Sequence, residues 1–214
     1  MHVNARRKGQ ADAHSQRGVA LITAVIMLLV ITLLAVAGAR AALDSKRSSR
    51  NQRDFDIAFQ AAEAALRDAE LDIQKGSREA KFDPTQPEGF TVGCGISTTA
   101  GTPTLGLCDT VDTWQTTNVW DTVDWTASSG QHTVEYGTFT GLVFPTGSGL
   151  TPGRKPRYLI EKFPDTELGE GADQEKPKKY IYRVTAVGFG PNDTTRAMVQ
   201  MYYRKQEPEP PAAP

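Results

Sequence analysis

Histidine is scarce in this chain of 214 residues, which has three, and His132 is the only one beyond residue 18. The sequence contains neither the H-E-x-x-H pattern of zinc proteases nor the G-x-S-x-G pattern of serine hydrolases. A lone histidine outside such a motif is more often a surface residue than a catalytic base. The sequence therefore predicts no enzyme and implies no cofactor.

Cysteine is equally rare, and the two that occur, Cys94 and Cys108, lie in a stretch rich in glycine and threonine. If this stretch is exported, a disulfide between them is the expected state. Closing a loop of about 15 residues would contribute roughly 3 kcal/mol in the chain-entropy model. Two unpaired, buried thiols are the alternative.

The formal net charge of −1 conceals an uneven distribution, because Arg6, Arg7, Lys8 and Arg17 oppose only Asp12 in the first 18 residues. The remaining body is mildly acidic. It shows no basic surface pattern for nucleic acid, so no nucleic-acid partner is expected.

An uncharged apolar run extends from Val19 to Ala39. As a helix its 21 residues span about 31 Å, enough to cross the hydrocarbon core of a bilayer. Because basic residues precede the run, its amino end should stay in the cytoplasm and the rest should be exported. Arg40, Lys46 and Arg47 weaken this charge bias.

The tripeptide Gln16-Arg17-Gly18 stands directly before the apolar run, whereas an ordinary signal peptide has its cleavage site after it. A cut between Gly18 and Val19 would remove the basic leader and retain the membrane helix. In one alternative, Gly18 is incidental in a signal anchor. In the other, conventional cleavage occurs within 35–41, although the apolar run is longer than a usual signal core.

Residues 40–75 have helical periodicity, and Gly76 is a plausible C-cap. No proline interrupts 19–75, so one helix of about 85 Å is expected. Its second half should pack on a sheet through an apolar stripe made of Phe55, Phe59, Ala62, Leu66, Ala69 and Ile73.

Strand patterns follow at 133–144, 157–163, 180–189 and 196–204, and the turn sequence at 190–194 predicts that the last two form an antiparallel hairpin. The expected fold class is α+β: a long amino-terminal helix packed against an antiparallel sheet of about four strands.

Four acidic residues interleave with tryptophans after Cys108: Asp109, Asp112, Asp121 and Asp124. They are weak candidates for a calcium-stiffened loop or an adhesive surface. Their spacing does not match an EF-hand, so solvated acids beside tryptophans folded onto the sheet are the simpler interpretation. No other metal site is predicted.

The segments QRGVALITAVIMLLVITLLAV and FQAAEAALRDAE resemble the amino-terminal region of the PilX family of type IV pilus minor pilins. The runs RYLIEKF, YIYRVTAVGFG and VQMYY are similar to that family's closing strands. The resemblance implies a pilin-like fold. It also implies cleavage between Gly18 and Val19 by prepilin peptidase and N-methylation of Val19.

The resemblance further implies a single-pass inner-membrane protein with a periplasmic head, later transferred to an extracellular pilus. Partners would be other minor pilins and the major pilin, reached through the amino-terminal helix. Most pilins have glutamate at the fifth mature position, where this chain has Thr23. A buried carboxylate is costly without a partner, so a subunit with no neighbour above it gains from losing the glutamate. The missing glutamate therefore suits a subunit at or near the filament tip.

The expected organisation is a leader at 1–18, a membrane or filament-core half-helix at 19–39 and an amphipathic half-helix at 40–75. A globular head at 76–205 and a proline-rich disordered tail at 206–214 follow. Two rival functions stay open: a K-type pseudopilin of type II secretion, and a signal-anchored periplasmic binding domain.

Overall fold

A computed structural model describes residues 16–96, 101–109, 118–128, 131–165, 179–192 and 194–206, with side chains from residue 18 onward. The predicted leader, apart from its last three residues, and the tail beyond residue 206 lie outside these ranges. The chain divides into two compact units, Met1–Arg50 and Asn51–Pro214.

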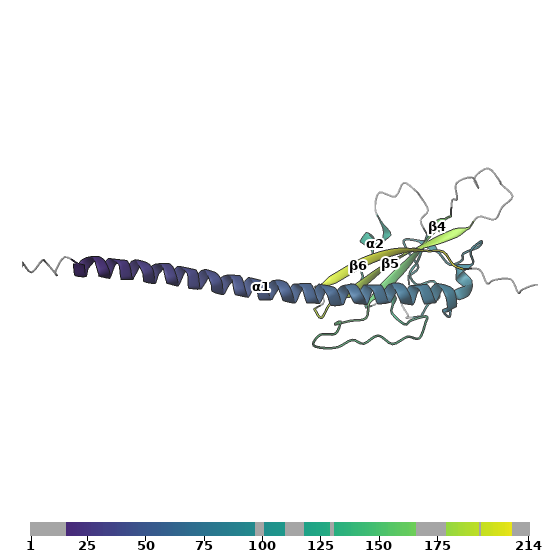
Figure 1. Cartoon of the computed structure of the whole chain (residues 1–214). Coiled ribbons are helices and arrows are strands. Elements are labelled where there is room, and N and C mark those ends of the chain that lie inside the picture. Colours follow the sequence, from purple (N-terminus) through teal and green to yellow (C-terminus); the bar gives the residue numbers. More distant parts are fainter. Residues whose placement is uncertain are drawn as a thin grey trace, which may run out of the picture. The chain divides into compact units, whose positions relative to one another are not determined.

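Helix α1 runs without a break from Gln16 to Lys75 and belongs to both units (Figure 1). It ends where the sequence predicts, at Gly76, whose backbone N–H donates to the Asp72 carbonyl at 3.1 Å. A side chain at position 76 would lie 2.6 Å from that carbonyl oxygen, so only glycine fits this exit from the helix.

The head contains a six-stranded mixed sheet with the order β1-β2-β4-β5-β6, and β3 also pairs with β4. The pairs β1–β2 and β2–β4 are parallel, and the other pairs are antiparallel. The strands are β1 Thr91–Val92, β2 Leu107–Asp109, β3 Val134–Glu135, β4 Arg157–Pro164, β5 Tyr180–Phe189 and β6 Arg196–Tyr203, and the short helices are η1 Glu79–Phe82 and α2 Val119–Thr122.

One face of this sheet packs against the head portion of α1 (Figure 1). The contact is unusually close at Gly188 of β5, where an added Cβ would lie 2.0 Å from the Ala58 carbonyl oxygen and 2.3 Å from the Ala62 nitrogen. The helix therefore meets the sheet through small side chains. Its buried apolar residues are Ala58, Ala61, Ala62, Ala65, Ala69 and Ile73.

The opposite face of the sheet is covered in part by a second apolar cluster centred on Trp125, Leu159 and Phe189. The disulfide-bonded cysteines, Val119 of α2 and Val187 of β5 also belong to this cluster. Burial of each large apolar side chain contributes roughly 1.5–3 kcal/mol, so the far face adds materially to the stability of the head.

The α+β class and the long helix on a sheet are confirmed, but two details of the prediction were wrong. The sheet has six strands rather than about four, and parallel pairs join β1, β2 and β4. The strand expected at 133–144 is reduced to β3, because the chain turns at Gly137, which has a φ of 80°.

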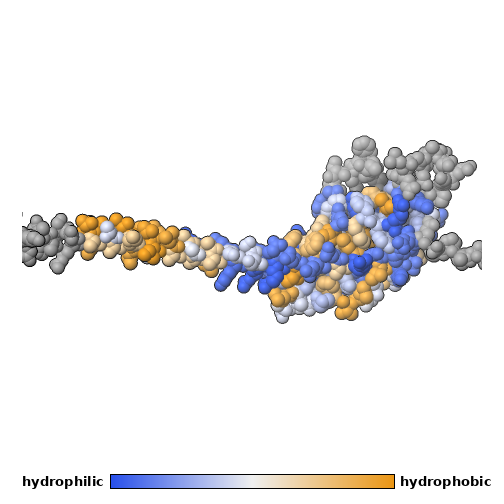
Figure 2. All heavy atoms as spheres, viewed as in Figure 1, coloured by the Kyte–Doolittle hydropathy of each residue, from blue (hydrophilic) through white to orange (hydrophobic). Residues whose placement is uncertain are grey.

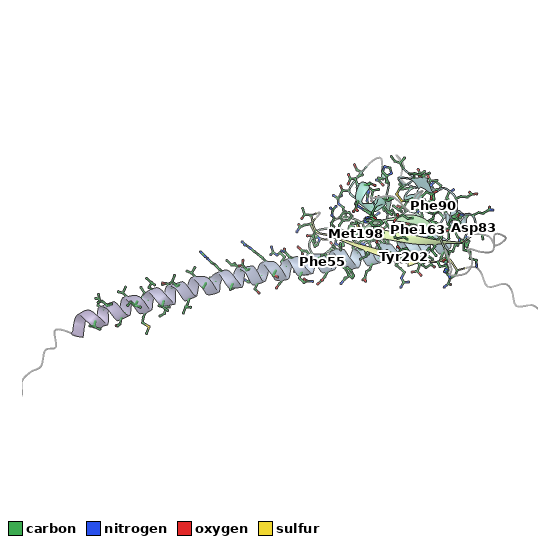
Figure 3. The ribbon with its side chains drawn as sticks, turned by 90° about the horizontal axis from the view of Figure 1, so that it is seen from above. Phe55, Asp83, Phe90, Phe163, Met198 and Tyr202 are labelled. Carbon is green, nitrogen blue, oxygen red and sulfur yellow. A yellow bond between two sulfur atoms is a disulfide. The ribbon has the colours of Figure 1, made fainter. Side chains whose placement is uncertain are left out.

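The predicted packing stripe was partly wrong. Ala62, Ala69 and Ile73 are buried and Leu66 is partly buried against the core, whereas Phe55 is 46% exposed and Phe59 is 40% exposed. Figure 3 labels Phe55 on α1. The close approach at Gly188 explains this, because it leaves room for alanine and none for a phenyl ring.

Candidate functional site

The first compact unit presents an apolar helix surface that no other described residue covers. Along α1 every side chain from Val19 to Ala39 is exposed, and the hydropathy colouring of Figure 2 shows this segment as apolar. Among the described residues, the helical stretch Gly18–Lys75 is long and apolar enough to cross a membrane. A helix that is apolar on all sides requires lipid or other apolar helices around it.

The proposed cleavage site lies at the very start of α1. The Gly18–Val19 bond falls in the first turn, where the backbone N–H groups have no partner within the helix. Apart from its chain neighbours and the backbone of its own helix, no atom comes within 4 Å of the position that a Cβ at Gly18 would occupy, and Val19 is exposed. This bond therefore lies in a turn that lacks some of the hydrogen bonds of the helix interior.

Thr23 lies on the exposed surface of the apolar segment. Its Oγ1 donates to the Ala20 carbonyl at 3.0 Å, so the hydroxyl is satisfied within its own helix. A threonine bonded in this way enters an apolar environment at small cost, whereas a carboxylate at the same position would need an outside partner.

Cys94 and Cys108 form a disulfide bond. It ties the chain just after β1 to β2, where Thr91 pairs with Cys108. Cys94 has a φ of 70°, a left-handed conformation that only a tightly constrained non-glycine residue retains. Both cysteines are buried against Trp125 and its neighbours, so the bond anchors the covering of the far face.

The described acidic candidates do not converge on one point. Asp109 pairs with Lys162 at 3.2 Å. Asp121 accepts from Asn118, and hydrogen bonds from the side chain and backbone of Thr126 lower the pKa of Asp124. Asp112 lies outside the described residues, and within those residues no three histidine, cysteine or acidic side chains could hold a metal ion.

A buried ionic network, not predicted from the sequence, fastens α1 to the head. Asp72 of α1 accepts from Arg78 Nη2 at 2.6 Å and from the Tyr158 hydroxyl at 2.9 Å. The guanidinium also donates to the Leu105 carbonyl and lies 3.7 Å from the centre of the Phe139 ring. Burial and the nearby Asp72 carboxylate raise the pKa of Tyr158 well above its usual value.

One turn earlier, Asp68 holds the loop that passes beside α1. Its carboxylate accepts from the Gly137 N–H at 2.8 Å and from the Thr140 hydroxyl. Burial raises the pKa of Asp68 even though these hydrogen bonds act in the opposite direction. The spacing of Asp68 and Asp72 among buried alanines was the sequence signal for this network, since four residues separate positions on one helix face.

A second buried ion pair lies on the opposite face of the sheet. Arg183 of β5 makes two hydrogen bonds, at 2.9 and 2.8 Å, to Glu161 of β4. The guanidinium also contacts the rings of Trp120 and Phe163, and Phe163 lies next to Tyr202 of β6 (Figure 3). These contacts link Trp120 of α2 to the sheet and leave Tyr202 exposed beside them.

An uncovered apolar half-helix joined to a sheet-packed half-helix defines a pilin-like protein. Comparison with protein families gives two matches: PilX N-terminal over residues 17–67, and Type IV pilus assembly protein PilX C-term over residues 104–205. Together they cover more than two thirds of the chain. No curated protein and no solved structure matches the chain.

The chain thus belongs to the PilX family of type IV pilus assembly proteins. A role in assembling the type IV pilus follows from this membership, as does interaction with other components of the pilus. The long apolar helix is compatible with a single-pass anchor in the inner membrane.

Proposed function

We propose that the chain is a minor pilin that is incorporated at or near the tip of a type IV pilus and helps to prime its assembly. In this capacity it supports pilus-dependent motility and adhesion. The observation that carries the proposal is the apolar surface of residues 19–39, exposed on every side and directly preceded by a basic leader. Such a surface serves first in lipid and then in a helical bundle.

Maturation is the first step of this function. Prepilin peptidase would cut between Gly18 and Val19 and N-methylate Val19, leaving the head on the periplasmic side. The position of the bond in the first turn of α1 supports access for a peptidase, because little helical structure must open. The amino-terminal family match, which begins at residue 17, supports the same boundary.

Assembly would then move the helix from the bilayer into the filament core, where it packs against the major pilin and other minor pilins. Both environments exclude water and accept the same aliphatic side chains. Thr23 supports a place at the tip. Its hydroxyl needs no neighbour, so this subunit lacks the buried carboxylate that a neighbouring subunit would otherwise have to pair. Gold labelling of the head on isolated pili tests the tip position.

The rival K-type pseudopilin of type II secretion typically has a large helical insertion in its head. Within the described part of this head, the helices are η1 and α2, each of four residues. The carboxyl-terminal family match favours the pilus.

Processing is tested by replacing Gly18 with leucine in the native host. The Gly18→Leu chain should accumulate as precursor in the inner membrane, and pili should become fewer. Gly38→Leu is the matched control, because Gly38 lies in the same helix and also has open space around its Cβ position. Normal processing of Gly18→Leu, or equal loss of processing in Gly38→Leu, would refute the cleavage site.

A further inference from the structure

The helix surface that follows the apolar segment is basic on one side. Arg40, Lys46, Arg47 and Arg50 are all exposed, and at 100° per residue they fall within an arc of about 120° around α1. Leu43, also exposed, lies in the same arc. We call these four basic residues and Leu43 the basic face.

The positive charge of the basic face is largely uncompensated. Asp44 is the sole acidic residue between 40 and 50, and its carboxylate lies 4.0 Å from Arg47, whose side chain is 80% exposed. An exposed pair at this distance contributes little. No acidic side chain among the described residues pairs with Arg40, Lys46 or Arg50.

The basic face begins where the membrane-spanning segment ends. Lys46 and Arg47 follow Arg40 by about 10 Å along the helix axis, and Arg50 follows by about 15 Å. Side chains on a helix lean toward its amino end, and long basic side chains extend further toward a polar boundary. They therefore point back toward the apolar segment and the headgroup region that would border it.

We propose that the basic face binds the phosphates of anionic phospholipids in the leaflet at the exported end of the helix. This inference rests on the proposed membrane-anchored stage of the minor pilin. Because the charges occupy one side, binding also tilts the helix toward that side. Each basic residue near an anionic surface strengthens binding roughly fivefold, so the three net charges give a preference on the order of a hundredfold.

A lipid surface suits the basic face better than an acidic protein surface does. The basic residues surround Leu43 and continue directly from the apolar run, so the face is apolar at one end and charged at the other. A bilayer surface has the same order, with apolar hydrocarbon first and charged headgroups beyond it. Basic residues at an exported end also oppose the usual positive-inside bias, and contact with anionic headgroups offsets that disadvantage.

Native mass spectrometry of the full chain in detergent tests the proposal. The chain is mixed with phosphatidylglycerol and with phosphatidylcholine of the same acyl chains. Wild type should bind phosphatidylglycerol preferentially, and the variant R40Q/K46Q/R47Q/R50Q should lose at least tenfold of that preference. The control R67Q/K75Q/K179Q/R196Q removes four exposed basic residues of the second compact unit, and the leader stays unchanged in every chain.

Loss of the preference in the first variant alone supports the basic face as the lipid site. An unchanged preference in that variant, or an equal loss in the control, overturns it. A third arm adds inorganic phosphate, which should displace no more phosphatidylglycerol than chloride of equal ionic strength does. Stronger displacement would show a site for free phosphate and would overturn the lipid assignment.

Failure of this inference can be separated from failure of the proposed function. Protease added to spheroplasts should digest the head of wild type and of both variants, because export precedes any lipid preference. A protected head would refute the proposed membrane-anchored stage. A digested head without a preference for phosphatidylglycerol would refute the lipid site alone.

Discussion

Arg78 is the residue on which the junction between α1 and the head depends most. Its side chain is 1% exposed, and it makes three hydrogen bonds to Asp72 and two to the carbonyls of Pro103 and Leu105. Replacement by methionine keeps most of the volume and leaves the Asp72 carboxylate buried without its cation. Such a change costs about 3–5 kcal/mol, because the charge stays uncompensated.

The cost should appear as a fall in melting temperature of about 6–20 °C for a domain of this size. Tryptophan fluorescence of the full chain in detergent is a suitable assay, because Trp120 and Trp125 belong to the head. The same substitution at Arg67 is the control. That arginine pairs with Glu70 on the surface of α1 at 74% exposure, so the Arg67→Met change should cost less than about 1 kcal/mol.

The double variant Asp72→Asn, Arg78→Met separates charge from packing. With the buried carboxylate neutralised, it should recover at least about 2 kcal/mol relative to Arg78→Met alone. If Arg78→Met melts within a degree or two of Arg67→Met, the ionic network does not hold the junction. If the double variant is as unstable as the single one, lost packing explains the effect and the electrostatic argument is refuted.

Three further predictions concern the head. Gly188→Ala should cost about 1–3 kcal/mol by forcing β5 away from Ala58 and Ala62. Gly141→Ala, where φ is 73° and the space is open, tests backbone strain without a clash. Equal costs at both sites would contradict the close approach. Removing the disulfide by Cys94→Ala and Cys108→Ala should lower the free energy of unfolding by about 3 kcal/mol. Adding reductant should destabilise wild type but not this variant. A reductant effect on both would argue against the bond. Burial raises the pKa of Asp68 above 3.8 in the folded state, so the folded state binds the proton more tightly than the unfolded state does. Wild type should therefore lose stability relative to Asp68→Asn as pH rises from about 4 toward neutrality, which paired melting curves measure. A difference in stability that stays constant with pH would contradict the raised pKa.

Local sequence signals were sufficient for the parts of the fold that depend on near neighbours. The end of α1 at Lys75 follows from Gly76. The hairpin of β5 and β6 follows from the alternating pattern and the turn sequence at 190–194, which act locally. β5 has the predicted bounds, and β6 ends one residue before its predicted end. The pairing of β1 and β2 with β4 joins residues far apart in the chain. No local pattern marks such contacts.

Local sequence signals likewise predict some features of the candidate site and miss others. The apolar run could be identified because its meaning lies in sequence order alone, and the roles of Gly18 and Thr23 stay predictions of the same kind. The packing face of α1 was placed only in part, because large apolar residues such as Phe55 outweigh alanines in any periodicity argument. The structure instead selects the alanines, since Gly188 brings the sheet against the helix backbone. Asp68 and Asp72 were missed because charged residues are ordinarily expected on the surface.

The central claim is that the apolar half of α1 survives maturation and becomes the surface through which the subunit joins the pilus. The most direct test is mass spectrometry of the amino-terminal peptide of the chain, taken both from membranes and from sheared pili. The account predicts a peptide that begins at Val19 and carries one methyl group on its amine. A peptide that begins beyond Ala39, or an intact leader in both fractions, would contradict it.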